Sequence, residues 1–282
     1  MRILVADSFD DFRSHHARLL HEAHRLGSVH VVLWSDRIVA VKTGKPPSFP
    51  EAERLYLVST NRYVTAVSVA DEIDAASNNG GIPSEALIAP IQPDLWLDTE
   101  ENQARVDFCC RHGFEYRVLA ADDLAGFPEH DPVPEQGPRG GAVSIPNQKV
   151  VVTGCFDWFH SGHVRFFEEV SAYGKLYVVV GSDENVRLLK GEGRPLFPAA
   201  ERRYLVGSVR YVSQVLVSTG SGWMDAEPEI LALKPGLYVV NEDGDKPEKR
   251  AFCRQHDMAY LVLKRIPREG LAPRSSTVLR GY

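Results

Sequence analysis

An internal repeat constrains the fold of this sequence more than any other feature. Residues 2–36 align with residues 149–183 without a gap. After one extra residue in the second copy, the stretch that begins at Phe49 matches the stretch that begins at Phe197. The 282 residues are enough for two ordinary domains. The repeat therefore predicts two copies of one domain.

A segment rich in proline and glycine separates the two copies. Residues 126–147 contain these residues at a density that is typical of a linker. We therefore predict a first domain over residues 1–125 and a second domain over residues 148–282. A long surface loop inside a single domain is the alternative, but the repeat restarts directly after this segment.

Apolar strands alternate with helices in each copy. In the second copy, a β-branched run at residues 150–152 precedes a turn, and Val164, Phe167 and Val170 follow at helical spacing before an apolar strand at residues 176–180. Near-continuous apolar strands between helices indicate βαβ units. We predict an α/β protein with two tandem Rossmann-like domains, each a parallel sheet with helices on both faces. Ligands of such sheets bind at the carboxyl ends of the strands.

Composition and charge exclude several partners and locations. The formal charge of −6 and the pI of about 5.9 do not favour nucleic acid as a partner. No apolar run is long enough to span a bilayer, and Asp7 interrupts the N-terminal apolar stretch too early for a signal peptide, so we expect a cytoplasmic protein. The cysteines lack the spacing of zinc ligands. We expect small buried thiols at Cys109, Cys110, Cys155 and Cys253.

The turn after the first strand of the second copy concentrates residues that suit a phosphate. Residues 153–163 read T-G-C-F-D-W-F-H-S-G-H. Gly154 allows a sharp bend and a close approach of a ligand. The helix that follows presents free N–H groups at its start, which attract an anion. His160 and His163 are spaced to point the same way, and they are expected to donate hydrogen bonds to oxygens that gain charge in a transition state.

The pattern G-x-F-D-x-x-H-x-G-H at residues 154–163 resembles the signature of the cytidylyltransferase-like nucleotidyltransferases. The resemblance implies that the second copy transfers a cytidylyl group from CTP to a phosphorylated small molecule and releases pyrophosphate. It implies that His160 and His163 are catalytic. A lone pair of histidines at this spacing is more often structural, but the glycines and the Phe-Asp pair at fixed positions favour function. The implied nucleotide contacts in the turn are Gly154, Cys155, Phe156, Asp157 and Gly162.

The resemblance extends to the rest of the second copy. Lys190 lies where the family has a catalytic, phosphate-contacting lysine, although solvated lysines are common in such loops. Arg210, in the segment Arg-Tyr-Val, resembles a family segment that favours CTP. Arg268 or Arg274 would take the place of the family's ordered arginine. The resemblance implies a C-terminal element that binds phosphates, and the same residues can also cap a last helix, because both roles use the same N–H groups; this element comprises Ser275, Ser276 and Thr277.

The implied reaction is an in-line displacement at the α-phosphorus of CTP. The attacking phosphate is already ionised near neutral pH, so positioning and charge stabilisation suffice. The resemblance also implies a Mg²⁺ ion that bridges phosphates, although the sequence offers no dedicated carboxylate cage. The acceptor stays open among phosphoethanolamine, phosphocholine, glycerol 3-phosphate, another sugar or polyol phosphate, and a phosphonate. Trp158, Phe159 and Trp223 either form an aromatic cage for a cationic head group or pack in the core.

The first copy has lost most of this motif. Asp7 stands at the position of Gly154 and Arg13 at that of His160, whereas His16 keeps the position of His163. We therefore predict that the first domain is a degenerate, inactive copy that packs on the second as an intramolecular pseudo-dimer. This tandem arrangement is similar to that of the ethanolamine-phosphate cytidylyltransferases. Positions shared by both copies, which we expect to include structural residues, are Phe9/Phe156, Asp36/Asp183, Glu53/Glu201, Arg54/Arg202 and Arg62/Arg210.

Three other interpretations compete with this one. The first is an adenylyltransferase that has the same fold but uses ATP instead of CTP and acts on a sugar phosphate. A class I aminoacyl-tRNA synthetase fragment shares the histidine turn, but the chain is acidic and lacks a Lys-Met-Ser-Lys-Ser element. The third is a non-catalytic nucleotide sensor, but the intact pair of His160 and His163 argues against it.

Overall fold

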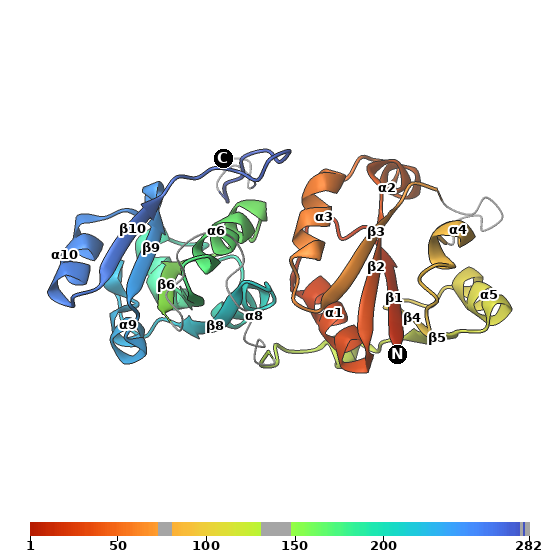
Figure 1. Cartoon of the computed structure of the whole chain (residues 1–282), viewed down its shortest axis with the longest axis horizontal. Helices are drawn as coiled ribbons and strands as arrows, with labels where there is room; N and C mark the ends of the chain where they lie inside the picture. Colours follow the sequence, from red (N-terminus) through yellow and green to blue (C-terminus); the bar gives the residue numbers. More distant parts are fainter. Residues whose placement is uncertain (73–80, 131–147, 277–278, 280–282) are drawn as a thin grey trace. The chain divides into compact units, whose positions relative to one another are not determined.

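The computed structural model describes residues 1–72, 81–130, 148–276 and 279. The chain divides into two compact units, Met1–Gly126 and Phe127–Tyr282 (Figure 1). Most of the predicted linker, residues 131–147, and the predicted site residue Thr277 lie outside the described residues.

The first unit is built on a five-stranded parallel sheet with the order β3-β2-β1-β4-β5. Its strands are β1 (Arg2–Asp7), β2 (Ser28–Trp34), β3 (Val64–Ala70), β4 (Leu95–Asp98) and β5 (Glu115–Val118). Its helices are α1 (Ser14–Leu26), α2 (Asp36–Thr43), α3 (Glu51–Ser59), α4 (Glu85–Ile88) and α5 (Gln103–His112), followed by the 3₁₀ turn η2 (Ala121–Leu124).

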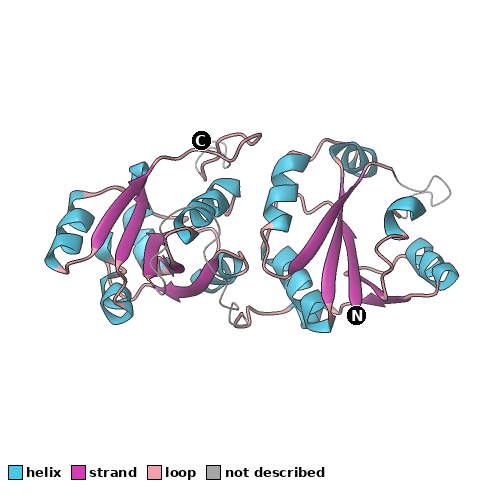
Figure 2. Cartoon of the chain, in the orientation of Figure 1, coloured by secondary structure: helices cyan, strands magenta, loops and turns pink. Residues whose placement is uncertain are grey.

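The second unit repeats this topology with the order β10-β9-β6-β7-β8, again all parallel. Its strands are β6 (Lys149–Gly154), β7 (Lys175–Val180), β8 (Val212–Val217), β9 (Leu237–Asn241) and β10 (Ala259–Leu263). Its helices are α6 (Ser161–Ser171), α7 (Asp183–Lys190), α8 (Ala199–Gly207), α9 (Glu227–Leu233) and α10 (Pro247–Gln255), with short 3₁₀ turns η3 (Gly222–Met224) and η4 (Glu242–Gly244). The predicted fold class, two tandem Rossmann-like α/β domains, is confirmed (Figure 2).

Alternation along the buried strands decides which helices cover which face of the second sheet. Val151 and Tyr238 pack in one core cluster with Ile230 of α9 and Phe252 of α10. Successive strand side chains point to opposite faces, so Val150 and its equivalents face the other helix layer. Both sets are buried, which explains why the strands read as continuous apolar runs.

The central strand of the second sheet marks the place where a ligand is expected. β6 pairs with β7 on one side and with β9 on the other, so the chain reverses its direction of winding at this strand. At such a switch point the loops that follow neighbouring strands diverge and leave a crevice at their carboxyl ends. The loop from β6 to α6, which carries the histidine motif, opens into that crevice.

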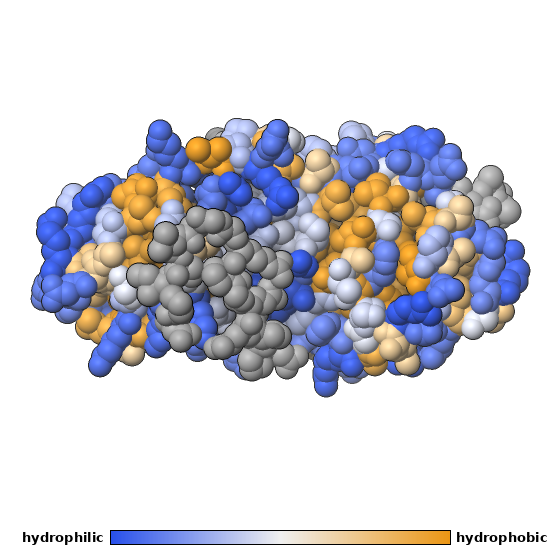
Figure 3. Space-filling model, viewed as in Figure 1, coloured by the Kyte–Doolittle hydropathy of each residue, from blue (hydrophilic) through white to orange (hydrophobic). Residues whose placement is uncertain are grey.

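The cysteines differ in part from the expectation. Cys109 and Cys253 are buried, as expected, but Cys110 is exposed and Cys155 is half-buried. Cys110 follows Cys109 on α5, and a step of one residue turns the side chain by about 100° around a helix, toward solvent. None of the described helices is long and apolar enough to cross a membrane. Figure 3 shows both hydrophilic and apolar residues on the visible surface of each domain.

Candidate nucleotide-binding site

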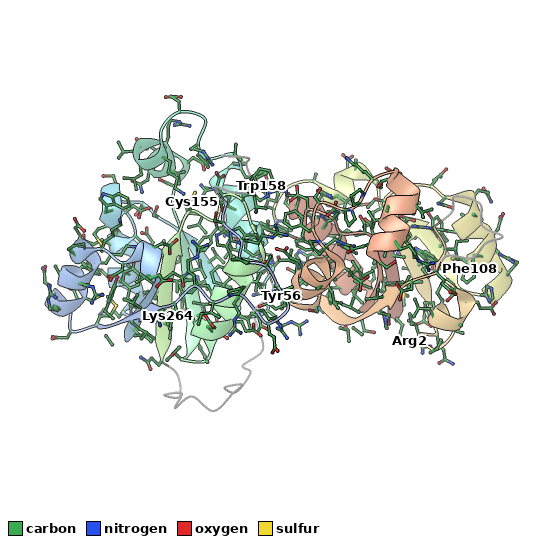
Figure 4. All side chains as sticks on the ribbon, turned by 90° about the horizontal axis from the view of Figure 1, so that it is seen from above. Arg2, Tyr56, Phe108, Cys155, Trp158 and Lys264 are labelled. Atoms are coloured by element: carbon green, nitrogen blue, oxygen red, sulfur yellow. The ribbon has the colours of Figure 1, made fainter. Side chains whose placement is uncertain are left out.

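The loop between β6 and α6 forms a tight turn around the ring of Phe156. Phe156 has a left-handed backbone with φ of 51°, and its equivalent in the first domain, Phe9, has φ of 48°. A Cβ atom on Gly154 would lie 2.8 Å from the Phe156 ring, so the ring in this position leaves no room for a side chain at the end of β6. Cys155 and Trp158 of the same loop are labelled in Figure 4. The turn is therefore specified by local packing as well as by any ligand.

His160 caps the start of α6 and lies against His163. The two rings stack with their centroids 3.9 Å apart and an interplanar angle of 19°. Nδ1 of His160 accepts a hydrogen bond from the N–H of Gly162 at 3.1 Å. A Cβ atom on Gly162 would approach the His160 ring to 3.0 Å, which explains the glycine between the two histidines.

Burial favours the neutral form of both imidazoles. Burial, together with the charges of Arg265 and Arg274, lowers the pKa of His160 to about 3. Burial is also the largest cause that holds the pKa of His163 well below its usual value, followed by the neighbouring His160. Because Nδ1 of a neutral His160 is an acceptor, its proton is on Nε2. His160 thus has a hydrogen-bond donor to offer to a ligand without carrying a positive charge.

A cavity of about 390 Å³ brings most of the predicted site residues together. The loops after four strands and the C-terminal segment all contribute to its wall. The predicted residues that line it are Gly154, Cys155, Phe156, Asp157, His160, Gly162, His163, Lys190, Ser275 and Ser276.

Asp157 has a structural task that the sequence left undecided. Its Oδ1 accepts hydrogen bonds from the backbone N–H groups of Leu196 (2.6 Å) and Phe197 (3.2 Å). Asp10, its equivalent in the first domain, accepts from two backbone N–H groups of the matching loop at 2.7 and 2.9 Å. The aspartate therefore fastens the same loop in both domains, including the one that lacks the histidine motif.

Three predicted arginines lie outside this cavity. Arg268 and Arg274 line a neighbouring cavity of about 410 Å³, which shares Gly162 and Ser275 with the first. Arg210 lies just before β8, at the amino end of a parallel strand, whereas the histidines follow the carboxyl end of β6. The structure therefore does not bring Arg210 together with the other predicted residues.

Several cavity residues were not singled out from the sequence, and Arg265 is the most prominent. It follows β10 and lines both cavities. Its guanidinium donates to Asp243 at 2.8 Å and to the carbonyl of Arg274 at 2.9 Å. Its place directly after an apolar strand is the signal that points to it, because all strands of the sheet end at this edge. Other cavity residues without a prediction include Asn185, Asp225, Asn241 and Lys249.

The three aromatic residues considered for a cage are not equivalent. Phe159 is buried and packs against His163 with a centroid distance of 5.7 Å. Trp223 is 55% exposed and lines the cavity, whereas Trp158 is half-buried and is not among the lining residues. Lys246 holds its ammonium 5.0 Å from the centre of the Trp223 ring. Trp223 is therefore the exposed aromatic surface of the cavity, and a cation of the protein already lies over it.

The corresponding place in the first domain is occupied by internal interactions. His15, which stands at the position of Gly162, lies against His16 with ring centroids 3.9 Å apart and the rings tilted by 42°, and their Nε2 atoms lie within hydrogen-bond distance at 3.2 Å. Burial raises the pKa of Asp7, the residue at the Gly154 position. Arg13 turns its guanidinium to Asp11 at 2.7 Å. In the first domain, the side chains at the positions of the motif therefore contact one another.

A parallel α/β sheet with a crevice at the carboxyl ends of its strands and two imidazoles at a helix start defines a Rossmann-like domain whose cavity suits a phosphate. A family model described as cytidylyltransferase-like matches residues 151–267. The chain belongs to this cytidylyltransferase-like nucleotidyltransferase family.

Curated relatives are similar to part of this chain. The FAD synthase of Thermococcus kodakarensis is 36% identical over 126 residues, which are 42% of this chain and 79% of that protein. The bifunctional protein HldE of Methylococcus capsulatus is 34% identical over 123 residues, 39% of this chain, and this match spans only 25% of HldE. A solved structure, the lipopolysaccharide core biosynthesis protein of Thermoplasma volcanium, covers 43% of this chain and 98% of its own, with 21% identity and a TM-score of 0.37.

Proposed function

We propose that the second domain transfers a nucleotidyl group from a nucleoside triphosphate to the phosphate of a small-molecule acceptor and releases pyrophosphate. The observation that carries this proposal is the stacked, neutral pair of His160 and His163 at the start of α6. Neutral N–H donors stabilise the charge that develops on phosphate oxygens during the displacement. The free N–H groups at the helix start add to this effect.

Cationic and hydroxyl groups around the pair would hold the triphosphate. Lys190 and Arg265 line the same cavity as the histidines. Ser275 and Ser276 lie in the segment that closes it, and the Ser276 hydroxyl donates to the carbonyl of Trp158 at 3.1 Å. Arg268 and Arg274, in the neighbouring cavity, would neutralise the outer phosphates. Charge of this kind supports an in-line displacement without a general base.

Magnesium would enter with the triphosphate as part of the substrate. Among the residues that the structure describes, no three His, Cys, Asp or Glu side chains come together as a metal cage. Asp243 of the cavity is paired with Arg265, and Asp225 accepts from Ser218 at 2.6 Å. These pairings fit a Mg²⁺ ion that is held mainly by the phosphates of the substrate, with few carboxylate ligands from the protein. Mg²⁺ is usually bound in this way. Such an ion neutralises phosphate charge.

Two observations bear on whether the nucleotide substrate is ATP or CTP. The sequence predicts CTP from the segment at Arg210, yet this residue lies at the opposite end of its strand, and Tyr211 donates its hydroxyl to Glu168 at 3.0 Å. The name FAD synthase describes a relative whose product contains an adenylyl group. We therefore rank ATP above CTP, and we keep CTP as the second candidate because of the family's cytidylyltransferase-like description.

The acceptor of this proposal carries no cationic head group. The ammonium of Lys246 already lies over Trp223, and like charges repel in a partly dehydrated cavity. Phe159 is buried and offers no second aromatic face. Sugar and polyol phosphates therefore suit the cavity better than phosphoethanolamine or phosphocholine.

We also propose that the first domain does not catalyse. Asp7 places a carboxyl group where the second domain has Gly154, and His15 and His16 satisfy each other.

Pyrophosphate release tests the proposed function. The full chain is incubated with MgATP or MgCTP and a panel of sugar, polyol, flavin and amino-alcohol phosphates. We expect release with ATP and one phosphate that has no cationic group. Release only with CTP would overturn the choice of base, and release without any acceptor would indicate hydrolysis instead of transfer.

A further inference from the structure

Lys249 is a buried cation that the proposed mechanism has not used. It lies in the first turn of α10, is only 9% exposed, and lines the same cavity as the histidine pair. Among the residues that the structure describes, none forms a hydrogen bond or an ion pair with its ammonium. Its ring contact is with Tyr238, whose centroid is 5.7 Å from Nζ. A buried ammonium that no carboxylate contacts directly is unfavourable, so a ligand anion would stabilise it.

The first domain supplies an internal comparison for this lysine. Arg105 is the third residue of α5 and Lys249 is the third residue of α10. The match is supported three and four residues later, where Phe-Cys stands in both helices. Arg105 lies over the ring of Trp96 at 5.0 Å, as Lys249 lies over Tyr238. Both domains therefore place a buried cation over the aromatic residue of the same strand.

The two domains differ in the partner of this cation. Arg105 forms an ion pair with Asp98, the last residue of β4. Counting from the first leucine of each strand, the residue of β9 that corresponds to Asp98 is Val240. The second domain, which has both His160 and His163, therefore has a cation at this position but no carboxylate at the position of Asp98. The nearby carboxylates have other partners, since Asp225 accepts from a serine and Asp243 pairs with an arginine.

The lysine and the histidines come from opposite walls of the cavity. α10 packs on the face of the sheet that carries Val151 and Tyr238, and α6 covers the other face (Figure 1). In an in-line displacement the attacking oxygen approaches opposite to the leaving pyrophosphate. If the triphosphate lies against the start of α6, the attacking phosphate arrives from the side of α10.

We propose that the ammonium of Lys249 binds the phosphate of the acceptor and holds it opposite the histidine pair. This inference rests on the proposed function for the identity of the anion. The exposed face of Trp223 lies at the same wall, because η3 and α10 are in contact. The acceptor is therefore a phosphomonoester whose uncharged body packs on this ring.

Phosphate binding to the full chain tests the role of Lys249. The protein is saturated with Mg²⁺ and an ATP analogue that has a methylene group between the α- and β-phosphorus, and inorganic phosphate is titrated by ³¹P NMR. We expect Lys249→Gln to weaken phosphate binding about 10- to 100-fold, the usual effect of losing one charge-assisted hydrogen bond. Lys249→Arg keeps the charge and should stay within a few-fold of the wild type. The affinity for the nucleotide analogue should not change.

A second variant recreates the arrangement of the first domain. Val240→Asp supplies the carboxylate that Asp98 supplies to Arg105, so it should weaken phosphate binding as strongly as Lys249→Gln does. Equal phosphate affinity in the wild type and Lys249→Gln would overturn the proposal, as would a wild type that binds no phosphate. A parallel loss of nucleotide affinity would assign Lys249 to the triphosphate instead. If phosphate binding depends on Lys249 but no acceptor is ever nucleotidylated, the proposed function fails and the anion site stands.

Discussion

Arg54 and Arg202 hold equivalent positions in the two domains and bind equivalent acceptors. Arg202 donates, at 2.7–2.8 Å, to the carbonyl oxygens of Cys155, Gly181 and Phe197 and to the carboxylate of Asp183. Arg54 donates, at 2.6–2.9 Å, to the carbonyl oxygens of Ser8, Trp34 and Phe49 and to the carboxylate of Asp36. Both guanidinium groups are buried and tie together the ends of two strands and a loop. A structural role therefore explains why both domains have an arginine at this position.

Replacing Arg202 should destabilise the second domain. Arg202→Met leaves three carbonyl groups at the buried guanidinium site and one carboxylate without their donor, and the free energy of unfolding should fall by about 3–5 kcal/mol. Its neighbour Arg203 pairs with the exposed Glu129, so Arg203→Met should change that free energy by about 1 kcal/mol or less. Thermal or urea unfolding measures both. Equal effects of the two substitutions would contradict the structural role of Arg202.

Replacing either histidine of the pair should slow turnover strongly. His160→Ala and His163→Ala each remove one donor to the transition state, and we expect kcat to fall about 10²- to 10³-fold. His16→Ala, the matching change in the first domain, should leave kcat unchanged. Steady-state kinetics of the three variants decides the question. Near-normal turnover in both variants of the second domain would refute the assignment.

The pH dependence of the imidazoles follows from their burial. The pKa of His160 is about 3 when folded against an ordinary value of 6.5, so the unfolded chain binds more protons below pH 6.5. This contribution to the free energy of unfolding is complete above about pH 6.5 and is lost as the pH falls toward 3. In NMR titrations, the ring signals of His160 and His163 should not shift between pH 5 and 8. A midpoint near 6.5 for either ring would contradict its burial.

The chain should bind one nucleotide, not two. The second domain has the histidine pair beside its cavity, whereas the first domain pairs His15 with His16 and carries Asp7 at the end of its central strand. Isothermal titration with the Mg²⁺ complex of a non-hydrolysable ATP analogue should give a stoichiometry near one. A stoichiometry of two would show that the first domain still binds nucleotide.

The repeat and the apolar periodicity were enough to predict the fold. Both are local features of the sequence, and they yield the same five-stranded topology twice. The turn from Gly154 to His163 was predictable for the same reason, because its residues adjoin along the chain. The predicted packing of the first domain on the second stays a prediction.

The remaining site residues were beyond sequence reasoning because tertiary structure brings them together. Arg265 and Lys249 belong to no motif, and only the parallel order of β6, β9 and β10 carries them to the histidine pair. Arg210 lies away from this cavity, and the resemblance identifies its segment without showing at which end of β8 it lies. The hydrogen bonds of Asp157 to a distant loop likewise could not be read from its place in the motif.

The reaction that we propose for the second domain is displacement at the α-phosphorus by an acceptor phosphate. Its most direct test uses ATP labelled with ³²P at the α or the γ position, together with the acceptor that supports pyrophosphate release. We predict that α-label appears in the acceptor product, that γ-label appears only in pyrophosphate, and that both transfers are nearly lost in His160→Ala. Transfer of γ-label to the acceptor would instead show a kinase reaction and would contradict the account.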